Sequence, residues 1–142
     1  MGGFGAIHTA LAYPGTFGGV VALSSALIIY DIQGMQPGTQ NPIANYEYYH
    51  EVFGDLDTVE KSDANPEILY RKCLASGMKI PPVYLAVGTE DFLYENNQKF
   101  RRFLEEQHAV FMYEEGPGTH DWKFWNHYVV NGVEWILKTN AK

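Results

Sequence analysis

Two residues that can transfer protons, Asp91 and His120, each come after a predicted strand. Asp91 lies in GTEDF after the apolar run PVYLAV, and His120 lies in GPGTHDW after the apolar run VFMY. Because the carboxyl ends of parallel strands share one edge of a sheet, we expect both side chains at that edge. A carboxylate that orients an imidazole forms an acid–base pair, and an ordinary histidine titrates near ~6.5, which suits proton transfer at neutral pH. The acid-then-histidine order is the second part of a Ser…Asp…His triad.

Structural roles compete with this interpretation. Asp91 precedes a predicted helix and suits its N-cap, a role that can coexist with catalysis. Glu90 is expected to be a solvated loop charge, and Asp121 is expected to cap the helix after His120. The remaining histidines are expected on the surface or in packing: His8, His50, His108 and His127.

The elements that must position Asp91 and His120 occur in an α/β order. Short apolar runs without alternation predict parallel strands covered on both faces, at 19–23, 82–87 and 110–113. A first helix is predicted through Phe4, Ile7 and Leu11, with Gly2, Gly3 and Gly5 in a first turn that should approach a strand or a ligand closely. A helix over about 92–107 should bury Leu93, Phe100, Phe103 and Leu104, and a helix over about 122–139 should bury Trp125, Tyr128, Val129, Gly132 and Ile136. The order is helix, strand, long insertion, strand, helix, strand, helix, which is the second half of an open α/β sheet. We therefore predict a single partial domain over 1–142, with an insertion at about 26–80.

The predicted insertion begins as loop and carries two helix signals. Asn65 and Pro66 start a helix that Gly77 ends. Before it, a predicted short helix carries four aromatic residues: Tyr46, Tyr48, Tyr49 and Phe53. These aromatic side chains either line an acyl or sugar pocket or pack the insertion onto the body, and the sequence leaves both interpretations open.

The first residues resemble part of a nucleophile elbow. MGGFGA is similar to the residues on the C-terminal side of the serine in a G-x-S-M-G-G turn, with Gly2 as the last glycine of the motif. ALSSAL, the run from Phe53 to Pro66, GTEDFLYENNQKF and GTHDWKFW extend the resemblance over nearly the whole chain. Together they resemble the serine esterases of the α/β-hydrolase superfamily, in the branch of tributyrin-type acetyl esterases, S-formylglutathione hydrolase and feruloyl esterases.

This resemblance implies the C-terminal half of an α/β-hydrolase fold. Asp91 would be the triad acid, His120 the general base, and the backbone N–H of Met1 part of the oxyanion hole. The nucleophilic serine would stand just before Met1, so none is expected in this chain; Ser24 and Ser25 lack the glycine-flanked elbow. The implied activity is hydrolysis of short-chain acyl esters without a cofactor. The alternatives are an inactive remnant or binding module, and one chain of a split hydrolase.

Composition restricts the partners. A net charge of −7 with only 10 Lys and Arg disfavours nucleic acid and anionic membrane. One cysteine permits no intrachain disulfide or cysteine metal cluster, and no other metal-ligand spacing is present. We expect a small-molecule ester substrate, and a cytoplasmic protein if Met1 is the true start. Without the early strands, an uncovered sheet edge predicts homo-oligomers or association with an N-terminal portion.

Overall fold

The computed structural model describes residues 1–141 and contains a parallel sheet flanked by helices. The elements are α1 (Gly2–Ala12), β1 (Val20–Leu23), α2 (Ile29–Ile32), α3 (Tyr46–Phe53), η1 (Val59–Lys61), α4 (Pro66–Ala75), β2 (Val83–Gly88), α5 (Tyr94–Glu106), β3 (Phe111–Gly116) and α6 (Trp122–Asn140). The strands run parallel in the order β1-β2-β3, with Val20, Val83 and Phe111 in register. The predicted α/β class and parallel sheet are confirmed.

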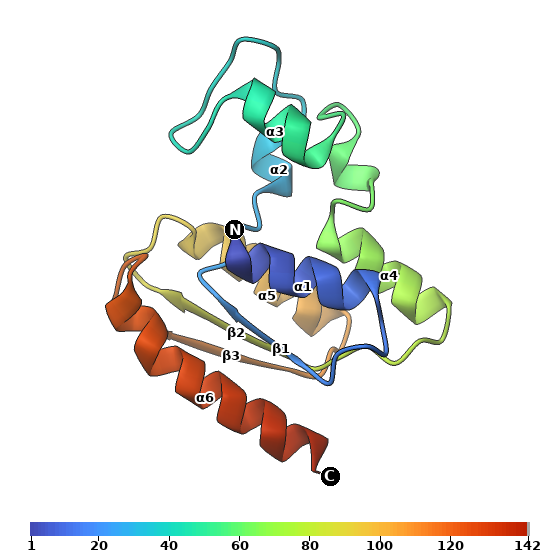
Figure 1. The fold of residues 1–142 in the computed structure, drawn as a ribbon, viewed down its shortest axis with the longest axis vertical. Helices are drawn as coiled ribbons and strands as arrows, with labels where there is room; N and C mark the ends of the chain where they lie inside the picture. Colours follow the sequence, from blue (N-terminus) through green and yellow to red (C-terminus); the bar gives the residue numbers. More distant parts are fainter. Residues whose placement is uncertain (142) are drawn as a thin grey trace.

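Helices cover both faces of the sheet. Figure 1 shows α1 and α5 on one face and α6 on the other, with α4 beside α1. The larger core lies between the sheet and α1, α4 and α5, whereas a small cluster of Tyr84, Ala86 and Phe124 lies under α6. Among the strands in residues 1–141, β2 alone is buried along its whole length, whereas buried and partly buried residues alternate in β1. The prediction of two covered faces is therefore correct for β2 and wrong for the partly exposed edge strand β3.

The helices that flank the site differ in how well their buried faces were predicted. The expected inward side chains of α5 are all buried: Leu93, Phe100, Phe103 and Leu104. On α6, Gly132 contacts the sheet, and a Cβ there would lie 2.6 Å from a Val21 methyl carbon. Val129, expected inside, is 38% exposed, while Phe124 is buried instead. The close approach at Gly132 thus brings only a narrow face of α6 onto the sheet.

β3 continues beyond its apolar residues through two glutamates that were expected in a loop. Glu114 accepts hydrogen bonds from the Tyr84 hydroxyl and the Asn131 amide on the α6 side. Glu115 accepts one from the Tyr113 hydroxyl, 2.7 Å away, and others from α5. Because both carboxylates have partners, the charged residues extend the strand to the loop that carries His120.

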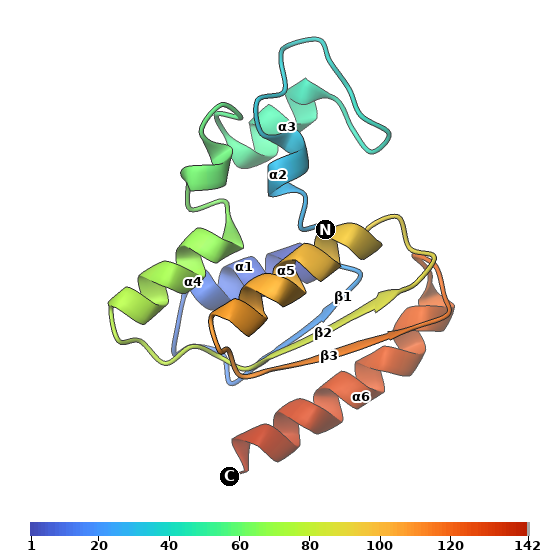
Figure 2. The ribbon, with the colours of Figure 1, turned by 180° about the vertical axis from the view of Figure 1, so that it is seen from behind.

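The segment between β1 and β2 projects away from the sheet. Its α2 and α3 stand beyond the start of α1 and of α5, as Figures 1 and 2 show from opposite sides. Asn65 caps α4 by accepting the Glu67 N–H at 3.0 Å, and Gly77 comes after the helix with φ +65°, as predicted. The short helix α2 was not predicted; its buried face comes from Ile28, Ile29 and Ile32. In the described chain, no helix has the length and apolar character needed to cross a membrane.

Candidate active site

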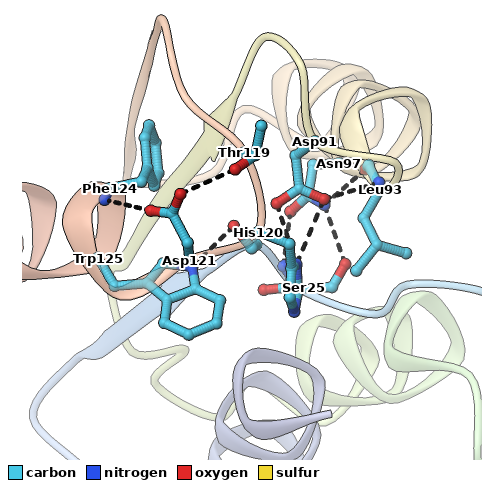
Figure 3. Close-up of polar contacts among 10 residues, drawn as sticks. Ser25, Asp91, Leu93, Asn97, Thr119, His120, Asp121, Phe124 and Trp125 are labelled. Carbon is cyan, nitrogen blue, oxygen red and sulfur yellow. Dashed lines mark hydrogen bonds and ion pairs between the residues drawn. The ribbon is translucent and has the colours of Figure 1, made fainter.

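Asp91 and His120 are hydrogen-bonded at the carboxyl-terminal edge of the sheet. The Nδ1 atom of His120 lies 3.0 Å from Oδ2 and 3.3 Å from Oδ1 of Asp91 (Figure 3). They come from the loops after β2 and β3, two neighbouring parallel strands. The carboxylate of Asp91 is inaccessible, whereas the His120 side chain is 30% exposed. The pair therefore consists of a buried acid and a histidine that solutes can reach.

Asp91 is fixed by its own turn. Its Oδ1 accepts the backbone N–H of Leu93 at 2.9 Å, and its carbonyl accepts the N–H of Tyr94 at 2.9 Å. The prediction that Asp91 is the N-cap is wrong, because α5 begins at Tyr94 with Leu93 in the cap position. The carboxylate closes a turn just before the helix, which holds one oxygen while the other faces His120.

Two aromatic side chains hold the imidazole of His120. Phe92 lies against it with ring centroids 4.9 Å apart, and Trp125 meets it edge-on at 4.9 Å and 90°. Trp125 in turn donates its Nε1–H to Ser24 Oγ at 3.0 Å. With Nδ1 engaged by Asp91, Nε2 is the ring nitrogen left for proton exchange with a substrate or nucleophile.

Glu90 ties together the loops that carry the pair. Its Oε2 accepts the N–H of Gly118 at 2.5 Å and the hydroxyl of Thr89 at 3.0 Å, and its own N–H reaches the Gly118 carbonyl at 3.1 Å. These donors, the Gly118 N–H above all, lower the pKa of Glu90. The loops also touch at Gly88, where a Cβ would lie 2.1 Å from Gly118 O. Glu90 is exposed as predicted, but no local pattern in the sequence indicates these bonds.

Asp121 caps α6 directly after His120, as predicted. Its Oδ1 accepts the Phe124 N–H at 3.0 Å, and its Oδ2 accepts the Thr119 hydroxyl at 2.8 Å. The Phe124 N–H is the main reason that the pKa of Asp121 is lowered. The cap fixes where the helix starts and hence where the preceding histidine stands.

The serines after β1 are engaged in the packing of the loop. Ser24 is 2% exposed, adopts φ +44° and accepts the Trp125 bond, while the fully buried hydroxyl of Ser25 has no hydrogen-bond partner in the described residues. Gly3 presses on this loop, since a Cβ there would lie 2.3 Å from Ser25 Oγ. The expected close approach of the first glycines thus occurs at Gly3, whereas Gly2 and Gly5 face open space.

Two hollows meet at the exposed side of the pair, and both are bordered by His120 and Met1. The larger has a volume of about 740 Å³ and is lined by Phe92, Leu93 and the segment from Gln40 to Asn45. The smaller, of about 380 Å³, is lined by the end of β1, Trp122 and Trp125. A small molecule in either hollow would reach the imidazole.

The outer wall of the larger hollow is a compact turn. Asn41 Oδ1 accepts the N–H groups of Ile43 and Ala44 and the hydroxyl of Tyr49 at 2.9–3.0 Å. Some of the aromatic residues on α3 line this hollow and others pack the segment onto the body, so both interpretations of the sequence hold in part. Tyr49 is fully buried and also lines the hollow, and the half-exposed Tyr48 lines it as well.

The rest of the α3 aromatic cluster packs. Phe53 meets Phe4 of α1 edge-on, with ring centroids 5.5 Å apart, and Tyr46 lies against His50. Within residues 1–141, no three His, Cys, Asp or Glu side chains gather as metal ligands.

Comparison with known proteins identifies the family. Residues 1–136 match the family described as "Putative esterase". The chain belongs to this esterase family. It is similar to an acetyl esterase from Caldicellulosiruptor saccharolyticus, with 42% identity over 140 residues, which cover 99% of this chain and 53% of that relative.

Solved esterase-family structures share the fold. An S-formylglutathione hydrolase from Staphylococcus aureus has 27% identity and a TM-score of 0.78, with 96% of this chain and 51% of that protein covered. Esterase B from Lactobacillus rhamnosis has 14% identity and a TM-score of 0.70, with 98% and 50% covered, and shows the fold alone. The chain spans about half the length of the relatives it matches. Its sheet and helices form half of an α/β-hydrolase fold, consistent with the predicted C-terminal half.

Proposed function

We propose that Asp91 and His120 are the acid and base of a serine carboxylesterase that acts on short acyl esters. The observation that carries this proposal is the 3.0 Å contact between the buried Asp91 carboxylate and His120 Nδ1, at the border of two hollows. Membership in the esterase family and the likeness to an acetyl esterase support it.

The proposed reaction uses a serine in the position just before Met1 of a longer chain. Its Oγ attacks the ester carbonyl carbon while its proton passes to His120 Nε2, and the proton then passes to the departing alcohol oxygen. Water, deprotonated by the same nitrogen, hydrolyses the acyl-enzyme. Asp91 holds Nδ1–H and stabilises the imidazolium that forms in both steps. Met1, which borders both hollows, would donate its peptide N–H to the oxyanion.

The 142-residue chain alone offers His120 no such serine. Ser24 Oγ is bonded to Trp125, and Ser25 Oγ is buried beside Gly3. We expect negligible hydrolysis of p-nitrophenyl acetate by the purified chain. Robust turnover that disappears in His120→Ala would contradict the placement of the serine ahead of Met1.

A fusion tests the whole proposal. The part of the Caldicellulosiruptor acetyl esterase that this chain does not match, which the proposal takes to be N-terminal, is joined ahead of Met1. The folded fusion should hydrolyse p-nitrophenyl acetate, and His120→Ala should abolish the activity. His127→Ala is the matched control, since this exposed α6 histidine packs against Tyr128 away from the pair. A folded fusion that is inactive, or that is unaffected by His120→Ala, would contradict the proposal.

Ester binding without hydrolysis is the second candidate, and the 740 Å³ hollow beside His120 favours it for this chain by itself. Adding the same N-terminal segment as a separate polypeptide tests the third, a split hydrolase. Activity that appears only on mixing indicates a split enzyme. Saturable binding of an ester with no activity in the mixture or in the fusion indicates a binding module.

A further inference from the structure

Asn97 lies at the centre of the site's buried hydrogen bonds, although among the described residues it bonds to neither Asp91 nor His120. It stands on α5, is fully buried, and uses its whole side-chain amide to hold two neighbouring backbone segments. Its Oδ1 accepts the Ser25 N–H at 3.2 Å, and its Nδ2 donates to the Ser25 carbonyl at 2.9 Å and to the Leu93 carbonyl at 2.8 Å. A buried amide satisfied in this way fixes both segments firmly.

One set of hydrogen bonds connects Asn97 to Asp91 through Leu93. The carbonyl of Leu93 accepts the side-chain amide of Asn97 at 2.8 Å and its backbone N–H at 3.1 Å, and the N–H of Leu93 donates to Asp91 Oδ1 at 2.9 Å. Leu93 therefore links the two side chains through both of its backbone groups. The position of the carboxylate depends on where Asn97 holds this residue.

A second set of contacts connects Asn97 to His120 through Ser25, Ser24 and Trp125. Asn97 holds Ser25, the adjacent Ser24 accepts the indole N–H of Trp125, and Trp125 packs edge-on against the imidazole of His120. The hydrogen bond from His120 to Asp91 completes this set of contacts; Figure 3 labels Asp91, Leu93, Asn97, Ser25, Trp125 and His120 among its members.

We propose that Asn97 is a positioning residue. With Trp125, it fixes the positions of the Asp91 carboxylate and the His120 imidazole relative to each other through the two sets of contacts just described. The inference rests on the proposed function, because this relative position matters for catalysis only where Nε2 must receive a proton. What it predicts is the tautomer of His120. When the carboxylate and the imidazole are held in place, the neutral ring is the Nδ1–H tautomer, because the hydrogen bond to the carboxylate decides which nitrogen carries the proton.

The test is the tautomer of His120 in the 142-residue chain, read from ¹⁵N–¹H correlation spectra at a pH where the ring is neutral. The parent chain should show the Nδ1–H form. Asn97→Ala removes both bonds to Ser25 and the side-chain bond to Leu93, and it keeps the backbone N–H of residue 97 on the Leu93 carbonyl. Trp125→Phe removes the bond to Ser24 and keeps a ring beside His120. Each variant should give a mixture of tautomers.

Gln98→Ala is the matched control. Gln98 is the next buried amide on α5, but it bonds to Tyr113 and Glu115 on β3 and not to Ser25 or Leu93. It should leave the tautomer unchanged at a comparable loss of stability. A folded Asn97→Ala that keeps the single tautomer, or a Gln98→Ala that loses it equally, would overturn the proposal.

Trp125→Phe decides the matter if Asn97→Ala does not fold. A mixture in that variant supports the inference, and an unchanged Nδ1–H form overturns it. The spectra need neither serine nor substrate, so this result stands apart from the hydrolysis assay. Ester hydrolysis can fail while the tautomer behaves as proposed, and the reverse can also occur.

Discussion

Glu90 binds Gly118 twice, through its carboxylate to the N–H at 2.5 Å and through its own N–H to the carbonyl at 3.1 Å. This contact joins the loop after β2 to the loop after β3, one residue before Asp91 and two residues before His120. An exposed glutamate thus joins the two loops that carry the pair.

Glu90→Gln should lower the free energy of unfolding at pH 7. The pKa of Glu90 is lowered in the folded chain, so its carboxylate adds stability above its unfolded pKa, and this contribution is lost as pH falls through the lowered folded pKa. The difference between parent and variant should therefore vanish in acid. Urea unfolding at pH 7 and at stepwise lower pH measures it, with the exposed α5 residue Glu106→Gln as control. A difference that persists unchanged below the lowered pKa would exclude this cause.

Gly88→Ala should destabilise the chain by about 1–3 kcal/mol, the usual cost of forcing a methyl group into a packed site. The added Cβ would lie 2.1 Å from the Gly118 carbonyl oxygen, so the backbone between the two loops must shift. Gly5→Ala is the matched control in open space on α1, where it should instead gain up to about 1 kcal/mol in helix propensity. Urea unfolding compares the two, and equal effects would speak against the close approach.

Asp91→Asn should lower kcat of the fusion with the acetyl esterase segment by about 10⁴-fold, because an amide no longer holds His120 in the tautomer that accepts a proton at Nε2. Asp121→Asn removes a neighbouring carboxylate but keeps a good N-cap for α6, so it should leave kcat nearly unchanged. Steady-state hydrolysis of p-nitrophenyl acetate measures both. A loss of similar size in the two variants would mean that the charge near His120, rather than the hydrogen bond, is what matters.

The 142-residue chain should self-associate through α6. This helix exposes Trp122, Val130, Val133 and Leu137, of which Leu137 is 66% exposed, and an apolar face of this kind favours contact with a second copy. Leu137→Lys should shift sedimentation velocity profiles toward the monomer, whereas His127→Lys, which places a charge on the exposed side of α6 away from these four residues, should not. A parent chain that sediments as a monomer at every concentration would refute the expectation.

The helices and strands were predictable where local pattern decides them. Phe100, Phe103 and Leu104 lie at helical spacing and are buried, and Asn65 before Pro66 caps α4 as its residue type favours. Glu114 and Glu115 were expected in a loop because charged residues rarely extend an apolar strand. Their tyrosine and amide partners come largely from distant parts of the chain, so local sequence carries no trace of them.

The site was predictable in its two reacting side chains and not in the contacts that hold them. Asp91 and His120 come after strand ends, and parallel strands bring such ends together. Asn97 has the pattern of an ordinary polar residue of an amphipathic helix, yet it is fully buried because the Ser25 backbone, 72 residues away, needs its amide. Contacts of that separation depend on the assembled tertiary structure.

The Asn41 turn that walls the larger hollow belongs to the projecting segment, whereas Asp91 and His120 belong to the loops after β2 and β3. Substitutions at Ile43 or Ala44 would reshape that wall while leaving every bond of Asp91 and His120 in place. Evolution can therefore alter which compounds this scaffold admits without first rebuilding its reactive groups, and directed selection in the laboratory can begin from the same six residues, 40–45.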